Sequence, residues 1–288
     1  MTKIKVAYLG PKNTYTETAA RQMFPDAELT DKEHIKLVML AVESGETHYG
    51  VVPFENIYNG KVINTLDALS DHAQESEIIG EVAIPIVHCF GALTGHEEIT
   101  QVLSKDQALD QCDSYLAENY PRAMRVAVAS TSTAVERIIK ERMLNAGAIA
   151  SKKGITGLEV LAEDICPNNK TRFFALGKYP TKPTGDDKTF ISFHPHITDE
   201  AGVLYRCLSP LNLFSINMGD IFSRPDRNQI QRGFHFFIEL NGHQQDTPIK
   251  KALESLRFYL DPQNKYPDAV RIYGSYPNSH WDDQAVAK

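Results

Sequence analysis

Residues 49–60 read YGVVPFENIYNG, and this stretch decides the fold class. Its apolar first half, Tyr49–Pro53, predicts a short buried strand, and Glu55 and Asn56 follow where that strand ends. Ligands of open α/β sheets bind beyond strand ends, so a carboxylate and an amide here indicate a binding site in which Glu55 could act as a proton donor. Spacing alone equally allows a Glu–Asn pair that only stabilises the turn before Gly60.

The same alternation of strand and helix patterns extends over residues 1–178. It predicts an α/β domain, because apolar runs of strand length are separated by amphipathic helical segments. The further expected strands are Ile4–Leu9, Val82–Phe90, Arg125–Ala129, Ala148–Ser151 and Arg172–Leu176. The expected helices are Tyr15–Phe24, Ile35–Ser44, Ser104–Asn119 and Thr133–Asn145.

Residues 179–187, YPTKPTGDD, are polar and contain two prolines, which predicts a linker. The pattern after this linker is different, because strands and helices follow in the order βαββαβ. That order predicts a ferredoxin-like domain over residues 188–277. The expected elements are Thr189–Phe193, Ala201–Leu211, Ser215–Phe222, Gly233–Leu240, Thr247–Phe258 and Ala269–Tyr273.

The composition of the 288-residue chain is that of an ordinary globular protein, with 42% apolar and 23% charged residues. The net charge of -7 works against nonspecific binding to nucleic acid or to anionic lipid. The N-terminus does not resemble a signal peptide and no apolar stretch is long enough to cross a bilayer, so we expect a cytoplasmic protein without a membrane partner. Four widely spaced cysteines predict reduced thiols rather than disulfides or a zinc site.

Three segments have the sequence of a strand followed by a capped helix. Thr14, Ser104 and Thr133 each stand three residues before a Glu or Gln, and Ser130 and Thr131 precede the last of them. Such helix N-termini present free backbone N–H groups and hydroxyls to anions, including carboxylates. One such motif is usually only a cap, but three in one α/β region favour a site for a polyanionic small molecule.

Two further short patterns carry side chains suited to the same chemistry. Gln111 lies seven residues after Ser104, so both side chains would lie on one face of a helix. Thr171 and Arg172 open an apolar strand: the arginine could bind a carboxylate with two hydrogen bonds, and the threonine could hydrogen-bond a leaving oxygen. No pattern typical of a nucleotide, metal or Ser-His-Asp site is present, so we expect neither a cofactor nor a metal.

Taken in order, these segments resemble the prephenate dehydratase family across nearly the whole chain. The family's motifs GPxGTF[ST]xxAA, GVVPxENSxxGxV, the ST-rich turn and NxTRF match residues 10–20, 50–62, 130–133 and 169–173. The tail resembles an ACT domain, whose motifs PGALxxxL, ESRP and LGSYP match residues 201–208, 222–225 and 273–277. Each motif is degenerate, and the signal comes from their number and order.

The resemblance implies a two-lobed, periplasmic-binding-protein-like catalytic domain followed by an ACT regulatory domain. It further implies the decarboxylating dehydration of prephenate to phenylpyruvate, in phenylalanine biosynthesis and without a cofactor. Thr171 would assist the departure of the hydroxyl group, and whether Thr171 or Glu55 is the general acid stays open. The remaining implied site residues are Asn56, Ser104 and Gln111 in the catalytic centre, and Thr14, Ser130, Thr131, Arg172 and Phe173 in substrate binding.

The ACT resemblance implies that phenylalanine is the effector. It also implies a homodimer or homotetramer, because such domains pair through their sheets, and we expect no chorismate mutase module before the first strand. The implied effector-binding residues are Gly202, Val203, Leu204, Asn217, Ser223, Arg224 and Pro225.

Three positions depart from the family motifs. Asn13 replaces a glycine, Ile57 replaces the serine after Glu-Asn, and Phe222 replaces the glutamate of ESRP. The missing glutamate predicts weak inhibition by phenylalanine. The lost hydroxyl at Ile57 keeps a prephenate decarboxylase, which retains the ring hydroxyl, as an alternative. A non-catalytic amino-acid sensor and arogenate as the substrate are further alternatives.

Overall fold

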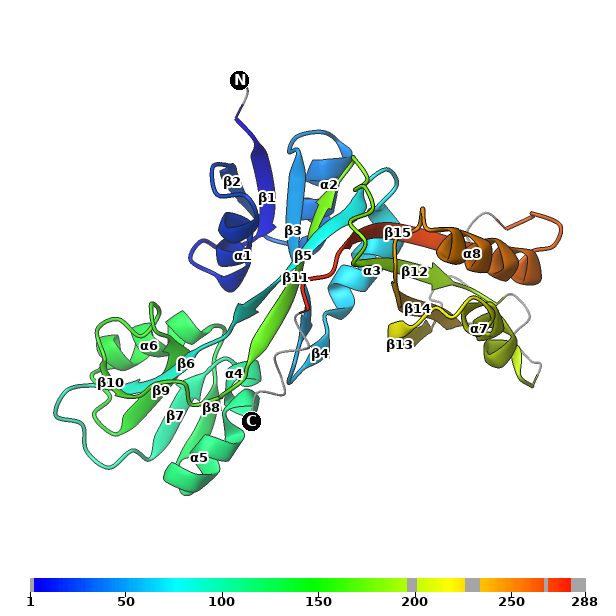
Figure 1. Cartoon of the computed structure of the whole chain (residues 1–288). Coiled ribbons are helices and arrows are strands. Elements are labelled where there is room, and N and C mark those ends of the chain that lie inside the picture. Colours follow the sequence, from blue (N-terminus) through cyan, green and yellow to red (C-terminus); the bar gives the residue numbers. More distant parts are fainter. Residues whose placement is uncertain (1–2, 196–200, 226–233, 267–268, 281–288) are drawn as a thin grey trace. The chain divides into compact units, whose positions relative to one another are not determined.

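The computed structural model describes residues 3–195, 201–225, 234–266 and 269–280 (Figure 1). Contacts between residues divide the chain into two compact units. The first unit contains Met1–Phe54, Val62–Ala83 and Arg172–Lys288, and the second contains Glu55–Lys61 and Ile84–Thr171. The second unit is therefore formed by two segments that are inserted into the sequence of the first.

The N-terminal part of the first unit is built on a sheet with the strand order β2-β1-β3-β11-β5, in which β4 pairs with β3. Strand β1 is parallel to both β2 and β3. The strands are β1 (Lys5–Leu9), β2 (Glu28–Lys32), β3 (Tyr49–Asn56), β4 (Gly60–Lys61), β5 (Glu77–Pro85) and β11 (Lys170–Gly177). The helices are α1 (Tyr15–Met23), α2 (Ile35–Glu43) and α3 (Ile63–His72).

The packing of α2 against β3 follows from their sequences. Ile35, Val38, Met39 and Val42 recur at helical spacing and are all buried, so α2 has one apolar face. A Cβ atom at Gly50 of β3 would lie 2.9 Å from Val38 Cγ1. The glycine therefore allows the helix to approach the strand closely.

The second unit is built on a sheet with the order β10-β6-β9-β7-β8, in which β7 is parallel to β8 and β9 while β6 is antiparallel to β9 and β10. Its strands are β6 (His88–Ala92), β7 (Gln101–Ser104), β8 (Met124–Ala127), β9 (Ala146–Ser151) and β10 (Glu159–Ala162). Its helices are α4 (Asp106–Gln111), α5 (Asp113–Asn119) and α6 (Thr131–Glu141).

Both faces of the second unit's sheet are buried. Successive residues of a strand point to opposite faces, and in β9 Ala148 and Ala150 join one apolar cluster while Ile149 joins another. The first cluster contains residues of α6 and the second contains residues of α4 and α5. The sheet is thus a central layer between helices, as the α/β pattern of the sequence predicted.

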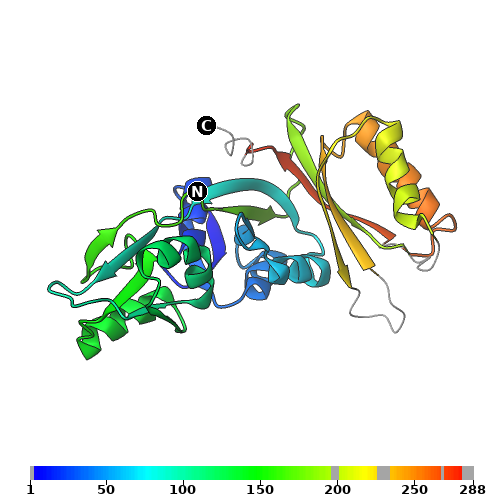
Figure 2. The same cartoon turned by 90° about the horizontal axis from the view of Figure 1, so that it is seen from below.

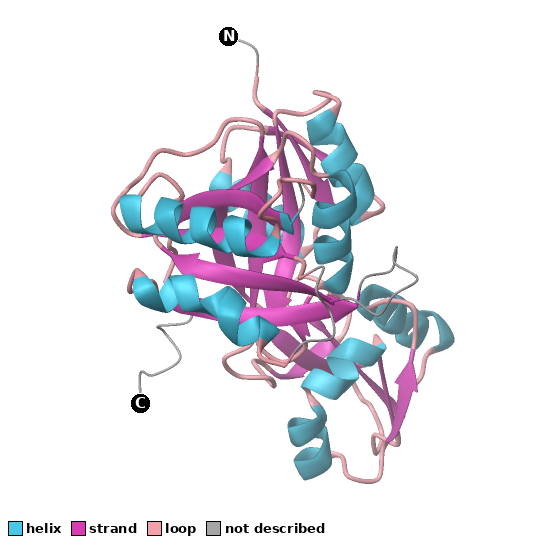
Figure 3. Cartoon of the chain, turned by 90° about the vertical axis from the view of Figure 1, so that its right-hand side faces the viewer, coloured by secondary structure: helices cyan, strands magenta, loops and turns pink. Residues whose placement is uncertain are grey.

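The C-terminal residues of the first unit form an antiparallel sheet with the order β13-β14-β12-β15. The elements are β12 (Asp187–Phe193), α7 (Val203–Leu213), β13 (Met218–Pro225), β14 (Phe234–Asn241), α8 (Thr247–Leu260) and β15 (Val270–Pro277). The predicted βαββαβ order is confirmed, although Gly233 of the predicted third strand lies outside the described residues. Helices α7 and α8 lie side by side on one face of this sheet (Figures 2 and 3).

The opposite face of the C-terminal sheet shares its core with the N-terminal sheet. Phe190, Phe237 and Tyr276 belong to the same buried cluster as Phe54 and Phe174. The ring of Phe190 meets that of Phe54 edge-on, with 5.4 Å between the centroids. The predicted linker, which lies between the end of β11 and the start of β12, therefore joins two sheets that bury a common set of aromatic rings.

Two predicted helices differ from those in the structure. The segment predicted as one helix, Ser104–Asn119, contains two helices, α4 and α5, which are separated at Cys112. The first of them begins after Lys105 and not at Ser104. The helix predicted from Thr133 begins at Thr131 and ends at Glu141, where Arg142 adopts a left-handed backbone conformation. Within the described part of the chain, none of the helices combines the length and the apolar character needed to span a bilayer.

Candidate active site

Polar side chains from four separate segments gather in the second unit. Asn56 lies at the end of β3, Gln111 at the end of α4, His88 in β6, and Asn169 and Thr171 at the start of β11. Hydrogen bonds join all five side chains. We call these five side chains the amide cluster. It unites Asn56, Gln111 and Thr171, which the sequence had placed in the catalytic centre.

The backbone fixes the orientation of the Asn56 side chain. The backbone N–H groups of Tyr58 and Asn59 donate to Asn56 Oδ1 at 3.0 and 3.1 Å, so this atom is the amide oxygen and not the nitrogen. The two protons of the nitrogen then face three acceptors: Asn169 Oδ1 at 2.7 Å, and the Lys170 backbone oxygen and Thr171 Oγ1 at 3.0 Å each. The turn after β3 therefore determines which atom of Asn56 faces the threonine.

The same logic orients Gln111 and Asn169. Gln111 Nε2 donates to Asn56 Oδ1 at 3.1 Å and also bonds Asn59 Oδ1. Its oxygen, Gln111 Oε1, accepts from Asn169 Nδ2 at 3.1 Å and lies 2.8 Å from His88 Nε2. Asn169 and His88 are 3% and 7% exposed, and each bonds the Gln111 oxygen in this buried position.

The arrangement leaves the proton of the Thr171 hydroxyl available. Thr171 Oγ1 accepts a hydrogen bond from Asn56, and among the described residues no acceptor receives a bond from it. The side chain is only partly buried. A hydroxyl that accepts one hydrogen bond is a better donor in another, so Thr171 can donate to a bound ligand.

Glu55 forms an ion pair with Lys61. Its Oε2 lies 2.6 Å from Lys61 Nζ, and the two residues face each other across the β3–β4 ladder. An ion pair with an ammonium group requires an ionised carboxylate, which accepts protons rather than donating them. The observed geometry does not favour Glu55 as the acid.

The predicted position of Ser104 is wrong. Ser104 is the last residue of β7 rather than a helix cap, and its side chain is fully buried. Its hydroxyl donates to the backbone oxygen of Ile149 at 2.7 Å. The parallel pairing of β7 with β8 extends the strand to Ser104, so this hydroxyl does not share a helix face with Gln111.

Of the three predicted helix caps, one is present as predicted and one is present at a different residue. In the first unit, Thr14 caps α1 as predicted, since its hydroxyl accepts from Glu17 N at 3.4 Å. The Asn13 N–H, with Arg21 nearby, holds the pKa of Glu17 below its ordinary value. In the second unit, the cap of α6 is Ser130 and not Thr133, and Thr131 is the first helical residue.

The guanidinium of Arg172 contacts carboxylates of the protein itself. Arg172 belongs to the first unit, is 2% exposed and forms ion pairs with Glu81, at 2.6 Å, and with Glu239. Its guanidinium also lies over the ring of Phe54, 5.0 Å from the centroid. Phe173, the next residue, is a buried side chain of the same unit.

The predicted effector residues lie along the start of α7 and along β13. Gly202 caps α7 with a φ of +82°, a conformation that side chains disfavour, and Val203 and Leu204 are partly buried. Arg224 donates to Asp67 of α3 at 3.0 Å. Asn217, Ser223 and Pro225 are exposed.

Phe222, which replaces the expected glutamate of the sensor motif, is part of the first unit's packing. Its ring stacks on that of Phe237, with 5.2 Å between the centroids and 3° between the planes. It packs against the cluster that the two sheets of this unit share. The residue that departs from the motif therefore supplies an apolar contact where the motif would supply a carboxylate.

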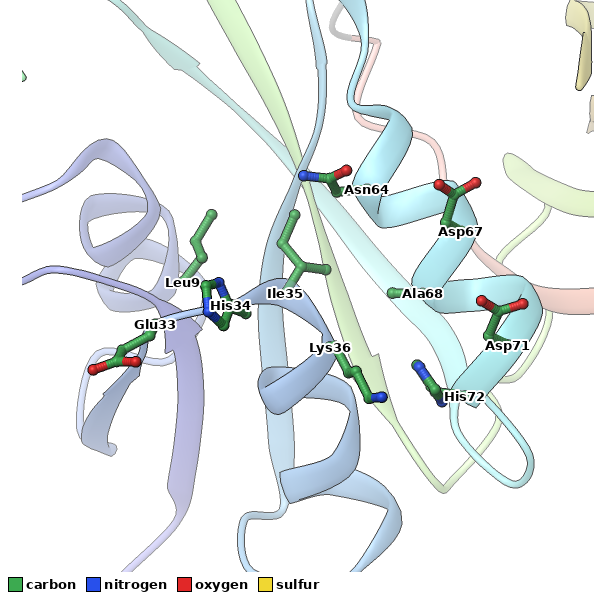
Figure 4. A pocket seen from close by; sticks show the side chains of 10 residues that line it. All are labelled: Leu9, Glu33, His34, Ile35, Lys36, Asn64, Asp67, Ala68, Asp71 and His72. Carbon is green, nitrogen blue, oxygen red and sulfur yellow. The ribbon is translucent and has the colours of Figure 1, made fainter. Parts of the chain in front are cut away.

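A pocket of 340 Å³ lies in the first unit between the first turn of α2 and one face of α3 (Figure 4). Side chains of both charges line it, including Lys36 on one side and Asp67, Asp71 and His72 on the other. Its lining contains none of the residues predicted from the sequence to bind substrate or effector. One lining residue, Asp67, contacts the predicted effector residue Arg224.

The sequence interpretation missed His88, Asn169 and Asn59 as parts of the site. Asn169 stands two residues before Thr171, a spacing that places both side chains on the same face of an extended segment, so its polarity was a usable signal. His88 lies within an apolar strand, where a polar side chain requires a buried partner. That partner, Gln111, is 23 residues away along the chain.

Comparisons with known proteins show the family to which the chain is similar. The family model described as prephenate dehydratase matches residues 6–181. A bifunctional chorismate mutase/prephenate dehydratase of Aquifex aeolicus is 37% identical over 283 residues, which cover 96% of this chain and 74% of the relative. The chloroplastic arogenate dehydratase/prephenate dehydratase 1 of Arabidopsis thaliana is 33% identical, with 96% and 72% covered. The crystal structure of an Arthrobacter aurescens prephenate dehydratase in complex with L-Phe is similar with a TM-score of 0.81 and 30% identity, covering 96% of this chain and 91% of that one.

Proposed function

The chain belongs to the prephenate dehydratase family, and we propose that it converts prephenate to phenylpyruvate by decarboxylating dehydration. In this reaction the ring carboxylate leaves as CO2, and the electron pair of the broken C–C bond moves into the ring. The hydroxyl at the opposite ring carbon leaves with its own bonding pair and takes up a proton to become water. Aromatisation of the ring drives both steps, so the protein's task is orientation and assistance to the leaving oxygen.

The observation that carries this proposal is the hydrogen bond from Asn56 Nδ2 to Thr171 Oγ1 at 3.0 Å. Because Thr171 Oγ1 accepts in this bond, its own proton can be donated to a ligand. In the proposed mechanism this hydroxyl donates a hydrogen bond to the oxygen that leaves the ring, where negative charge develops. A donor aimed at a developing charge acts most strongly in the transition state, which is what catalysis requires.

Glu55 supports the site indirectly in this mechanism. Its ion pair with Lys61 closes the short β3–β4 ladder, in which Asn56 also pairs with Gly60. The same turn supplies the two backbone N–H groups that orient Asn56. We therefore assign Glu55 a structural contribution and assign the contact with the leaving oxygen to Thr171.

The domain assignment rests on the element order and on the family match. We propose that residues 1–178 form the two-lobed, periplasmic-binding-protein-like catalytic domain, in which each unit contributes one sheet. The family model ends at residue 181, close to that boundary. We assign residues 188–277 to an ACT domain because their four strands are ordered β13-β14-β12-β15 with two helices on one face.

We further propose that phenylalanine is a weak effector and that the chain forms a homodimer or homotetramer through its C-terminal sheet. The similarity to an Arthrobacter aurescens prephenate dehydratase that binds L-Phe supports the choice of effector. The ring of Phe222 in place of a carboxylate supports the weakness, because it cannot form an ion pair with the effector's ammonium group. The exposed side chains of Asn217, Ser223 and Pro225 are accessible to such a ligand.

Incubation of the purified full chain with prephenate, followed by ultraviolet spectroscopy and mass spectrometry of the product, tests the activity. Formation of phenylpyruvate is the expected result. A hydroxylated cyclohexadiene product would instead identify a decarboxylase, and phenylalanine binding without turnover would identify a sensor. A parallel reaction with arogenate, which would give phenylalanine, decides between the two substrates that the names of its relatives contain.

A further inference from the structure

We propose that His88 is a positioning residue of this reaction. It acts through Gln111 and keeps the hydrogen bonds of the amide cluster in one direction, and this direction leaves the Thr171 proton free. The inference rests on the proposed role of Thr171. It concerns a side chain that does not touch Thr171 and that belongs to none of the sequence motifs. Four observations on the amide cluster lead to it.

The first observation fixes which nitrogen of His88 carries a proton. Gln111 Oε1 is the amide oxygen, because Gln111 Nε2 donates to Asn56 Oδ1, which already accepts two backbone N–H groups. His88 Nε2 lies 2.8 Å from Gln111 Oε1. Only a protonated Nε2 makes this contact a hydrogen bond, so His88 is the donor and Gln111 the acceptor.

The second observation concerns the other ring nitrogen. His88 Nδ1 is buried and has no hydrogen-bond partner among the described residues. An unprotonated nitrogen is less costly to bury at this position than an N–H group, because the proton of an N–H group would lack an acceptor. The ring is therefore neutral and protonated on Nε2 alone.

The third observation is the burial of the ring, which is 7% exposed. Burial holds the pKa of His88 below 6.5, although Gln111 and the charge of Asp164 act in the opposite direction. A second proton would place a charge in this interior next to an amide cluster that contains no carboxylate.

The fourth observation is the common direction of the bonds. His88 donates to Gln111, Gln111 donates to Asn56, and Asn56 donates to Thr171, whose hydroxyl is the last donor of the series. Hydrogen bonds aligned in this way polarise one another, by roughly 10–30% per bond. The loss of His88 removes one of the two donors to the Gln111 oxygen and leaves Asn169 as the other, so the orientation of this amide is held less firmly.

The experiment compares His88→Leu, His88→Gln and the control His96→Leu in the full chain. The Gln side chain can place an N–H near the position of His88 Nε2, whereas Leu cannot. His96 is an exposed histidine of the same unit, bonded only to the backbone oxygen of Glu97. We expect His88→Leu to lower kcat for prephenate about tenfold with KM changed less than about twofold, His88→Gln to recover most of kcat, and the control to match the wild type.

A double-mutant cycle separates positioning from a general structural effect. If His88 acts through Gln111, then His88→Leu lowers kcat in the wild type but not in a Gln111→Met background. Full additivity of the two effects on kcat would overturn the proposal. So would a His88→Leu variant that folds normally by thermal unfolding and keeps the wild-type kcat.

A spectroscopic test does not depend on turnover. In 15N-histidine-labelled protein, the ring nitrogens of His88 are assigned by the loss of their signals in His88→Gln. We expect a protonated Nε2 and an unprotonated Nδ1 at neutral pH. The opposite tautomer would overturn the positioning role even in an active enzyme, whereas the expected tautomer in a chain without prephenate turnover would leave the network intact and refute only the proposed function.

Discussion

Thr171 and Arg172 are adjacent in β11, yet the clusters around them are built on different principles. Thr171 belongs to a network of neutral amides, a neutral imidazole and backbone groups, in which each hydrogen bond has a defined direction. Arg172 belongs to a network of full charges with Glu81, Glu239 and Lys188, all of them buried. The boundary between the two units falls between the two residues.

The difference teaches what each network is suited to do. A neutral network leaves one hydroxyl proton unused and can direct it at a substrate without an unpaired charge in the site. The charged network has further donors within the protein: Tyr276 donates to Glu239 at 2.9 Å, and the backbone N–H of Ser279 donates to Glu81 at 3.0 Å. It joins strands of both sheets of the first unit, so we expect it to govern stability while the amide cluster governs turnover.

Removal of Arg172 should have the largest effect on stability. Arg172→Met leaves Glu81 and Glu239 buried with Lys188 as the one remaining paired cation among the described residues, and breaking a buried pair in this way costs about 3–5 kcal/mol. Urea denaturation measures this loss. Arg137→Met, which removes an exposed pair with Glu141 on α6, is the matched control and should change the free energy of unfolding by less than about 1 kcal/mol. A loss as small as that of the control would contradict the contrast between the clusters.

Thr171→Ala should leave stability nearly unchanged and impair turnover. Removing a single donor to a developing negative charge typically lowers kcat about 10²–10³-fold, and KM should change little because the bond strengthens in the transition state. Steady-state kinetics with prephenate measures both constants. Thr156→Ala, which removes an exposed hydroxyl bonded to the backbone oxygen of Lys153, is the control. Unchanged turnover in Thr171→Ala would show that Thr171 has no catalytic role.

The two clusters should also differ in their response to acid. His88 has a folded-state pKa below 6.5, so the unfolded chain binds its proton first, and the stability it contributes is complete above pH 6.5 and declines below it. Burial opposes the ionisation of Glu239, but Arg172 and Lys188 hold its pKa below 4.5, so its contribution is lost only as the pH falls below that value. Urea denaturation between pH 8 and pH 4 should show the first decline vanish in His88→Gln and the second in Glu239→Gln. A decline between pH 6.5 and 5 that persists unchanged in His88→Gln would assign it to another group.

Phe222→Glu should have the smallest effect on turnover and is directed at regulation. We expect phenylalanine to inhibit the wild type weakly and the variant more strongly, because the variant restores a carboxylate that can meet an ammonium group. Inhibition curves with phenylalanine at fixed prephenate measure the difference. Potent inhibition of the wild type at micromolar phenylalanine would refute the interpretation of Phe222.

The sequence predicted members of the amide cluster that lie at the ends of strands. Asn56 and Thr171 lie where an apolar run ends or begins, and the resemblance to the family motifs at these positions indicated a site. Ser104 failed because its local sequence resembles a helix cap, while the pairing of β7 with β8 and β9 keeps it extended. Local sequence does not contain the strand partners that decide such a position.

Arg172 illustrates a second limit. At the start of an apolar strand it looked like a group for binding a carboxylate, and it does bind two, but both belong to the protein. Glu81 and Glu239 are 91 and 67 residues away in the sequence. Contacts over such separations come from the arrangement of sheets, so they become visible only when the strands are assembled.

Because the second unit consists of two inserted segments, we expect the two units to fold in a defined order while the chain is synthesised on the ribosome. Most of that unit is the single segment Ile84–Thr171, so its sheet can assemble as soon as this segment emerges. The synthesis of the first unit begins earlier but is completed later, because β11 lies inside its sheet and the shared aromatic core includes Phe237 and Tyr276 from the C-terminal segment. We therefore expect nascent chains released near residue 180 to protect the amide hydrogens of the second sheet before those of the first.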